Sequence, residues 1–278
     1  MPKPKVVAFQ GEPGAFSQVA VEQLVGKVRV FPCQRFEEVF ESLHRGKVDA
    51  AVIPIENTLH GSVHENYDHL LHYELPIIGE THVRISHSLI ARPGVSMKRV
   101  KRVFSHPVAL NQCLNFFREH ARLERIPFYD TAGSVKMLME DGLADAAAIA
   151  SSIAAGIYGA HILKRGIEDD RQNFTRFFLL ARPGTHKPPK TAKLWKTSLV
   201  FTTRNIPGAL FRSLSAFALR DLNLTKIESR PLRGKPWEYL FYLDFLGHVD
   251  YPPAQKALGH LAELADMLRV LGSYPKGI

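Results

Sequence analysis

The stretch LPIIGETHVRISHSLI, residues 75–90, decides how this chain is expected to fold. It is too long for one ordinary strand, and its second half alternates apolar and polar residues, as a strand with one buried face does. On each side of it, short apolar runs alternate with segments of helical period, the pattern of α/β proteins. The sequence therefore predicts two α/β lobes joined by crossing strands, with parallel sheets and a ligand cleft between the lobes.

The expected elements come in pairs, a strand followed by a helix. Before the crossing stretch the pairs are 6–9 with 16–25, 28–31 with 36–44, and 50–55 with 63–71. After it they are 103–104 with 108–117, 126–129 with 134–139, and 146–150 with 153–158. The second lobe is expected at about 80–160.

A second domain is predicted after a linker. Residues 183–190, PGTHKPPK, combine stiff prolines and charge with no apolar period, so we expect a linker at 185–196 between domains at 1–184 and 197–278. The elements expected beyond it are a strand at 197–203, a helix at 209–219, strands at 224–229 and 237–245, a helix at 252–265 and a strand at 267–271. This βαββαβ order predicts a small ferredoxin-like unit.

Composition narrows the functional classes. The chain has 278 residues, 45% hydrophobic and 23% charged, with a net charge of +9, which favours anionic partners. Its basic clusters lack interleaved aromatics, so small polyanionic metabolites are expected rather than nucleic acid. The first residues contain no apolar run long enough for a signal peptide or membrane span, which predicts a cytoplasmic protein. Cys33 and Cys113 fit no zinc or disulfide spacing and are expected to be buried thiols.

The run Asn173-Phe174-Thr175-Arg176-Phe177 carries the clearest chemistry. It places a hydroxyl beside a permanent cation that suits a carboxylate, and the following residues 178–181 are expected to form a strand. A purely structural interpretation is also open, because Thr favours strands and a strand-end Arg often reaches solvent.

Polar residues recur where predicted strands meet helices, at 11–17, 56–58, 105–107 and 131–134. Each is open to interpretation as a cap or turn, but parallel strands would gather all of them at one edge, where helix starts favour anions. Glu56 follows a buried run and is expected to hold an Arg or hydroxyl partner rather than to act as a base.

Histidines at 60, 64, 69 and 72 invite a metal hypothesis, because His64, Asp68 and His72 recur at helical spacing. The same period produces a solvated helix face opposite Val63, Tyr67 and Leu70, and we favour that interpretation. Dinucleotide, P-loop and His-Glu-x-x-His motifs are absent, so no cofactor or metal is expected.

With these residues in view, the chain resembles prephenate dehydratases that carry a C-terminal ACT regulatory domain. The resemblance rests on the loop 11–17, GEPGAFS; on 54–58, PIENT; on 173–177, NFTRF; and on 207–211, PGALF, with 228–231, ESRP. It implies a two-lobed, periplasmic binding protein type II-like catalytic region and a βαββαβ ACT domain. Val108 stands where the family often has Gln, so we expect Val108 to serve packing alone.

The resemblance also implies a set of site residues. The implied catalytic residues are Thr175, Arg176 and Glu56. Those implied to bind substrate are Asn57, Thr58, Ser105, Gln112, Thr131, Ser134, Asn173 and Phe177. Those implied to bind phenylalanine are Asn205, Pro207, Gly208, Ala209, Leu210, Glu228, Ser229, Arg230 and Pro231.

The reaction implied by the resemblance converts prephenate to phenylpyruvate, carbon dioxide and water in phenylalanine biosynthesis. L-Phenylalanine would inhibit it by binding between paired ACT domains of a homodimer or homotetramer. Without a chorismate mutase segment, a single reaction is expected. The alternatives are arogenate dehydratase, which performs the same elimination on an amino substrate, and a non-catalytic metabolite sensor.

Overall fold

The computed structural model describes residues 4–186, 192–232, 234–235 and 237–277. Part of the linker predicted at 185–196 falls on 187–191, outside the described residues. Contacts divide the chain into two units. The large unit comprises residues up to 73 together with 81–179, and the small unit comprises 74–80 and the residues from 180 onward. No helix within the described ranges is long and apolar enough to cross a membrane.

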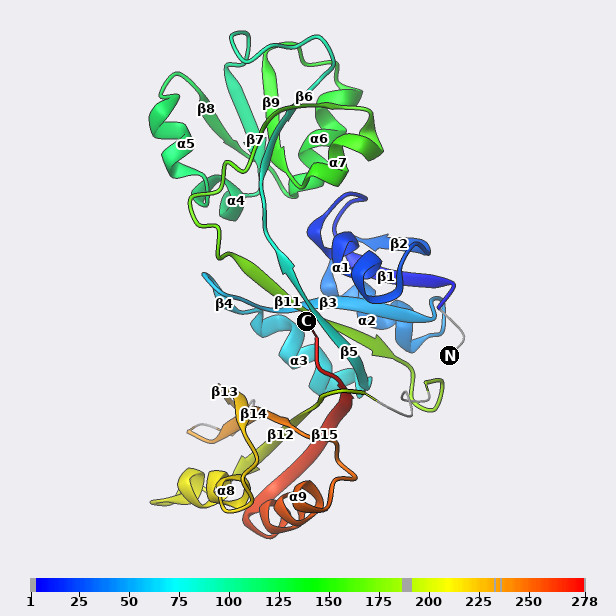
Figure 1. The fold of residues 1–278 in the computed structure, drawn as a ribbon, viewed down its shortest axis with the longest axis vertical. Coiled ribbons are helices and arrows are strands. Elements are labelled where there is room, and N and C mark those ends of the chain that lie inside the picture. The colour runs from blue at the N-terminus through cyan, green and yellow to red at the C-terminus, as the bar shows by residue number, and fades with distance from the viewer. Residues whose placement is uncertain (1–3, 187–191, 233, 236, 278) are drawn as a thin grey trace. The chain divides into compact units, whose positions relative to one another are not determined.

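The first lobe is built on one mixed sheet with strand order β2-β1-β3-β11-β5, to which β4 is added beside β3 (Figure 1); strand residues 77–80 and 180–181 of this sheet fall in the small unit. Its strands are β1 (Val6–Gln10), β2 (Arg29–Cys33), β3 (Ala50–Asn57), β4 (Gly61–Ser62), β5 (Ile77–Arg84) and β11 (Phe174–Ala181). Its helices are α1 (Phe16–Val25), α2 (Phe36–His44) and α3 (His64–Tyr73). Residues 7–9 of β1 and 50–53 of β3, the centres of the apolar runs that predicted these strands, are buried, as strands covered by helices require.

The second lobe contains a five-stranded sheet with order β10-β6-β9-β7-β8. Its strands are β6 (Ser88–Ala91), β7 (Arg102–Ser105), β8 (Glu124–Pro127), β9 (Ala146–Ala150) and β10 (His161–Arg165). Its helices are α4 (Pro107–Asn111), α5 (Leu114–Glu119), α6 (Thr131–Glu140) and α7 (Ser152–Tyr158). The sheet is not all-parallel as expected, because β6 runs antiparallel to both β9 and β10.

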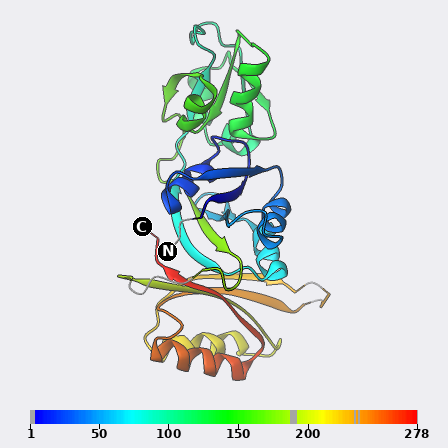
Figure 2. The ribbon, with the colours of Figure 1, turned by 90° about the vertical axis from the view of Figure 1, so that its right-hand side faces the viewer.

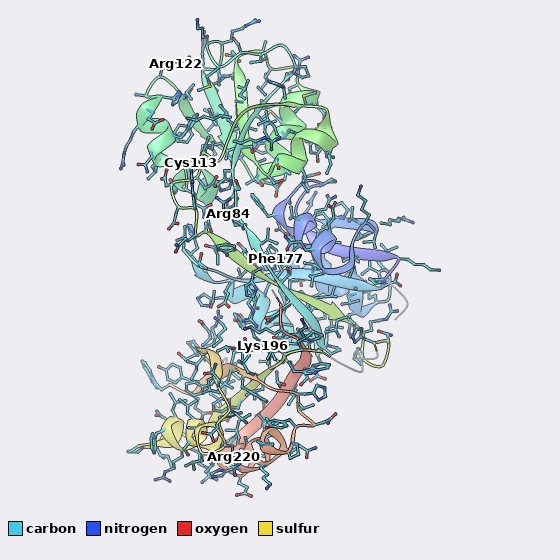
Figure 3. All side chains as sticks on the ribbon, viewed as in Figure 1. Arg84, Cys113, Arg122, Phe177, Lys196 and Arg220 are labelled. Atoms are coloured by element: carbon cyan, nitrogen blue, oxygen red, sulfur yellow. The ribbon has the colours of Figure 1, made fainter. Side chains whose placement is uncertain are left out.

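Two connections, 85–87 and 166–173, join the lobes (Figure 1). The stretch 75–90 therefore does cross between lobes, as β5, a short connection and β6. The two connections are bonded to each other, because Ile85 N–H donates to Asn173 O at 2.8 Å and Ile167 N–H to His87 O at 3.1 Å. The buried Glu168 carboxylate adds an ion pair with Arg84 at 2.8 Å; Figure 3 labels this arginine.

The single helix predicted over 108–117 is wrong, because the chain breaks between α4 and α5. The Asp169 carboxylate accepts from the N–H groups of Leu114 and Asn115 at 2.8 and 2.9 Å, which begins a new helix there. Gln112 O accepts from Asp169 N–H at 2.7 Å. A contact 57 residues away in sequence thus overrides the local helical period.

The small unit has the predicted βαββαβ order. Its elements are β12 (Trp195–Thr203), α8 (Ala209–Ala218), β13 (Leu224–Pro231), β14 (Tyr239–Leu246), α9 (Pro252–Leu264) and β15 (Ala265–Pro275). The sheet order is β13-β14-β12-β15, and both helices cover one face of it (Figure 2). β15 is longer than the predicted 267–271 because it pairs with β12 along its whole length.

Candidate active site

Thr175 and Arg176 lie inside β11, so their side chains point to opposite faces of the sheet. Thr175 is half-buried, whereas Arg176 is 4% exposed. The picture of a hydroxyl and a guanidinium side by side in one site is therefore corrected. The strand was predicted at 178–181, after the motif 173–177, so the alternation of side chains within the motif was not foreseen.

Asn57 orients the hydroxyl of Thr175. Its Nδ2 donates to Thr175 Oγ1 at 2.9 Å and to Asn173 Oδ1 at 2.7 Å. Its Oδ1 accepts from the N–H groups of Leu59 and His60 at 2.9 and 3.0 Å, which fixes which amide atom faces Thr175. Because Thr175 Oγ1 already accepts from Asn57, its own proton is directed to another acceptor.

Glu56 holds Arg176 on the other face. Arg176 Nη1 lies 3.2 Å from Glu56 Oε1, and the guanidinium stacks over the Phe178 ring at 4.7 Å from its centroid. Glu56 thus contacts an arginine, one of the two kinds of partner predicted for it. The guanidinium faces Glu56 and Phe178, and its contact with a substrate carboxylate stays a prediction.

Thr58 ties β3 to the start of β11. Its hydroxyl donates to Gln172 O at 2.9 Å and accepts from Phe174 N–H at 3.0 Å, while its own N–H donates to Phe174 O. Beside it, Asn173 is fully buried, and its Nδ2 has no hydrogen-bond partner among the described residues. Thr58 therefore supports the motif by holding the backbone that carries Thr175.

The predicted residues of the second lobe are divided between packing and contact with the first lobe. Ser105 and Ser134 are fully buried and donate to the carbonyls of Ile149 and Asp130 at 2.6 and 2.8 Å. Thr131 begins α6 and is half-buried. Gln112 reaches across the lobes, with Nε2 3.2 Å from His60 Nδ1 and Oε1 2.8 Å from His87 Nε2.

Two further residues differ from their predicted environments. Phe177, labelled in Figure 3, is 2% exposed and lies in the core, so its ring supports β11 rather than an open site. Val108 was expected to pack, but 38% of it is exposed on α4.

Sequence reasoning missed the contacts that hold the lobes together. Tyr129 Oη donates to Glu12 Oε1 at 2.9 Å, and Lys136 Nζ lies 3.3 Å from Glu12 Oε2. Nearby, Ser151 Oγ donates to Gly14 O at 2.5 Å. The loop 11–17 had been singled out as polar, but its partners lie more than 100 residues away and leave no local signal.

Burial shifts several pKa values. It lowers the pKa of His87, which is 2% exposed, and of His106, so both rings favour the neutral form. It raises the pKa of Asp130, although backbone N–H groups partly oppose this. The two cysteines are free and buried, as expected, and burial raises the pKa of Cys33 to about 11. Within the described ranges, no group of three or more His, Cys, Asp or Glu side chains is arranged to hold a metal.

The residues predicted to bind phenylalanine lie in the small unit on two elements. Those at 205–210 lead into α8, where Gly208 has a φ of 77°, and those at 228–231 end the edge strand β13. Asn205 Nδ2 donates to Trp237 O at 3.3 Å, and Glu228 lies 3.6 Å from Lys226. A cavity of about 210 Å³ at the start of α8 includes Ala209.

The fold and the site together define a mixed α/β protein of two lobes. Hydrogen bonds join the lobes, and the Thr175 hydroxyl on β11 lies near them. The prephenate dehydratase family model matches residues 7–185. The chain belongs to this family, and it is a dehydratase of the lyase class. The sequence resemblance to the catalytic family is thereby confirmed.

Similar proteins agree with this assignment. Arogenate dehydratase/prephenate dehydratase 2, chloroplastic, of Arabidopsis thaliana is 48% identical, over 97% of this chain and 72% of that protein. Arogenate dehydratase 2 of Petunia hybrida is 47% identical, over 97% and 71%. A prephenate dehydratase from Arthrobacter aurescens, solved in complex with L-Phe, has a TM-score of 0.87 at 34% identity, over 97% of this chain and 90% of that one.

One similar structure has a different description. GqqA, described as a novel type of quorum quenching acylase, has a TM-score of 0.90 at 35% identity, over 98% of each chain. One fold can host different reactions, and it is the residues of the site that determine which reaction a member of the fold catalyses.

Proposed function

We propose that this protein catalyses the decarboxylative dehydration of prephenate. The single observation that carries the proposal is the bond from Asn57 Nδ2 to Thr175 Oγ1, which leaves the Thr175 proton for another oxygen. The difficult step is the departure of the ring hydroxyl, since hydroxide is a poor leaving group. A donor held on that oxygen stabilises the developing charge.

The elimination balances without an oxidant or reductant. The bond between the ring and its carboxylate breaks and releases carbon dioxide, and its electron pair enters the ring. The ring carbon–oxygen bond breaks on the opposite side, and the hydroxyl leaves as water with one proton taken up. Phenylpyruvate remains, with an aromatic ring. Thr175 contributes a hydrogen bond to the leaving oxygen, and the proton that completes water comes ultimately from solvent.

Arogenate is the second candidate substrate. Its ring undergoes the same elimination, and the relatives named above include arogenate dehydratases. The two substrates differ only in a keto or amino group away from the reacting ring atoms. Purified full-length protein, incubated with either compound and followed by ultraviolet detection of the aromatic product, decides between them. No turnover of either substrate would refute the proposed function.

Regulation is proposed for the small unit. Its βαββαβ order supports an ACT domain, and the large unit supports a periplasmic binding protein type II-like catalytic region. We propose that L-phenylalanine binds the residues at 205–210 and 228–231 and inhibits the reaction. The edge strand β13 gives a second copy a place to pair, in a homodimer or homotetramer. The cytoplasm is the proposed location.

Calorimetry and a phenylalanine series in the activity assay test this regulation. Inhibition requires that phenylalanine bind more tightly to a less active state, since equal affinity for both states shifts nothing. Absence of binding heat, together with unchanged turnover, would remove the effector from the proposal.

A further inference from the structure

His87 lies where both lobes and their connection meet. It is 2% exposed and sits in the connection 85–87. Its ring lies nearly perpendicular to that of Phe16 of the first lobe, with centroids 5.6 Å apart. Its Nε2 lies 2.8 Å from Gln112 Oε1 of the second lobe. Neither composition nor motif singled this residue out.

The protonation state of His87 follows from its surroundings. Its Nδ1 is buried and has no hydrogen-bond partner among the described residues. A proton on Nδ1 would be an unsatisfied buried donor, whereas a proton on Nε2 is accepted by Gln112 Oε1. Glu168, the charged group that acts on the ring, is paired with Arg84 at 2.8 Å and also accepts the backbone N–H of His87. The ring is therefore neutral, with its proton on Nε2.

That tautomer determines how the Gln112 carboxamide is turned. Since Oε1 must face the Nε2–H of His87, the amide N–H2 of Gln112 faces the first lobe. There it lies 3.2 Å from Nδ1 of the exposed His60. If the carboxamide turned over, His87 would need the other tautomer, with its buried Nδ1–H unsatisfied. The backbone at Gln112 is held as well, because its carbonyl accepts from Asp169 N–H.

We propose that His87 is a positioning residue that fixes Gln112 as a hydrogen-bond donor to an oxygen of the substrate. His60 occupies this donor in the structure, and its exposed ring is free to give way to a substrate carboxylate or hydroxyl. Asn57, whose Nδ2 donates to the Thr175 hydroxyl on β11, lies beside the same nitrogen, with Oδ1 3.3 Å from His60 Nδ1, so the Gln112 donor and the Thr175 hydroxyl are close to one another. The inference deepens the proposed function and rests on it.

A double-mutant cycle tests the proposal in the full chain. His87→Phe keeps an aromatic ring near Phe16 but removes the donor to Gln112, and kcat/KM is expected to fall about 10- to 100-fold, as for other residues that orient a site group. In a Gln112→Ala background the same change is expected to cause no further fall, because the residue it positions is gone. His87→Gln, which supplies an amide donor, is expected to restore most of the activity.

His69→Phe is the matched control. His69 is a partly buried histidine on α3 that contacts Glu65, Phe40 and Tyr73, none of them a site residue, so its replacement is expected to leave kcat/KM unchanged. Wild-type kcat/KM in His87→Phe would overturn the proposal. The proposal would also be overturned if His87→Phe lowered kcat/KM by the same factor in the Gln112→Ala background as in the wild type. Independent effects of this kind are those of a general packing defect.

The ring tautomer gives a readout independent of turnover. Nitrogen-15 NMR of the wild-type protein is expected to show His87 neutral, with a protonated Nε2 and a bare Nδ1. A protonated Nδ1 would overturn the proposal even if His87→Phe fails to fold. If the wild type converts neither prephenate nor arogenate, the proposed function fails, while the NMR result still decides the orientation of Gln112.

Discussion

Asn57 Nδ2 donates to Thr175 Oγ1 at 2.9 Å, from the end of β3 to the neighbouring strand β11. These residues are 118 positions apart in the chain. The contact gives the threonine hydroxyl one acceptor role and leaves its proton available. Catalysis by this protein is therefore expected to depend on the Thr175 oxygen itself and not on the size of the side chain.

Replacing Thr175 by Val tests this dependence, because valine keeps the shape and removes the hydroxyl. We expect kcat to fall by roughly 10²- to 10³-fold, the usual effect of removing one donor to a developing oxyanion. Thr175→Ser keeps the oxygen and is expected to retain most of the activity. Steady-state kinetics on folded variants decides the matter, and a Val variant with normal kcat would exclude the hydroxyl from the mechanism.

The Glu56–Arg176 pair is expected to contribute to stability. Glu56→Leu leaves a guanidinium that is 4% exposed without its carboxylate partner, so the free energy of unfolding is expected to drop by about 3 kcal/mol. The control is Glu41→Ala, which breaks the exposed Arg45–Glu41 pair and is expected to cost at most about 1 kcal/mol. Equal losses in urea denaturation would contradict the assignment of Arg176 to a buried pair.

Gly14 is expected to be irreplaceable for the contact between the lobes. A Cβ at Gly14 would lie 2.7 Å from Ala154 Cα on α7, whereas a Cβ at Gly94 would meet nothing within 4 Å. Both glycines have positive φ, so an alanine at either position costs about 1–2 kcal/mol of backbone strain.

Gly14→Ala is therefore expected to lose more stability than Gly94→Ala and, unlike it, to reduce kcat/KM by disturbing the lobe contact. Thermal unfolding and kinetics of the two variants measure this difference. If the two variants lose the same stability and have the same kcat/KM, the close packing of Gly14 on Ala154 does not contribute to activity.

His87 is expected to make stability depend on pH. Burial lowers its folded-state pKa below the ordinary value of 6.5. The contribution of the neutral His87 ring to the free energy of unfolding is therefore fully present above pH 6.5. It is lost as the pH falls from 6.5 through the folded-state pKa of the ring. His87→Gln removes this dependence, so the difference in unfolding free energy between wild type and variant should change below pH 6.5. A constant difference from pH 7.5 to 5 would contradict a buried neutral ring. Because His106 is shifted in the same direction, only the difference is informative.

In the small unit, Lys196 and Glu80 form a buried pair at 2.7 Å (Figure 3 labels Lys196). Lys196→Met leaves a buried carboxylate without its cation, and the free energy of unfolding is expected to fall by about 3–5 kcal/mol. Adding Glu80→Met removes the stranded charge and is expected to recover much of that loss. A double variant less stable than Lys196→Met would show that Glu80 has a more important partner than Lys196.

Local patterns determined much of this protein. Apolar runs buried on both faces and helical periods predicted most elements of both lobes and the βαββαβ unit, because these patterns act over a few neighbouring residues. Short motifs such as NFTRF and PIENT identified the catalytic family for the same reason, because each motif is a contiguous run of residues.

Tertiary structure alone decided which groups work together. Strand alternation turns Thr175 and Arg176 to opposite faces, and only the neighbouring strand β3 shows that Asn57 meets one and Glu56 the other. The break at Gln112 and its bond to His87 likewise depend on contacts between distant segments. The spacing of residues along the chain does not predict such contacts. They form when whole helices and strands pack together, and not through the local conformational preference of the residues.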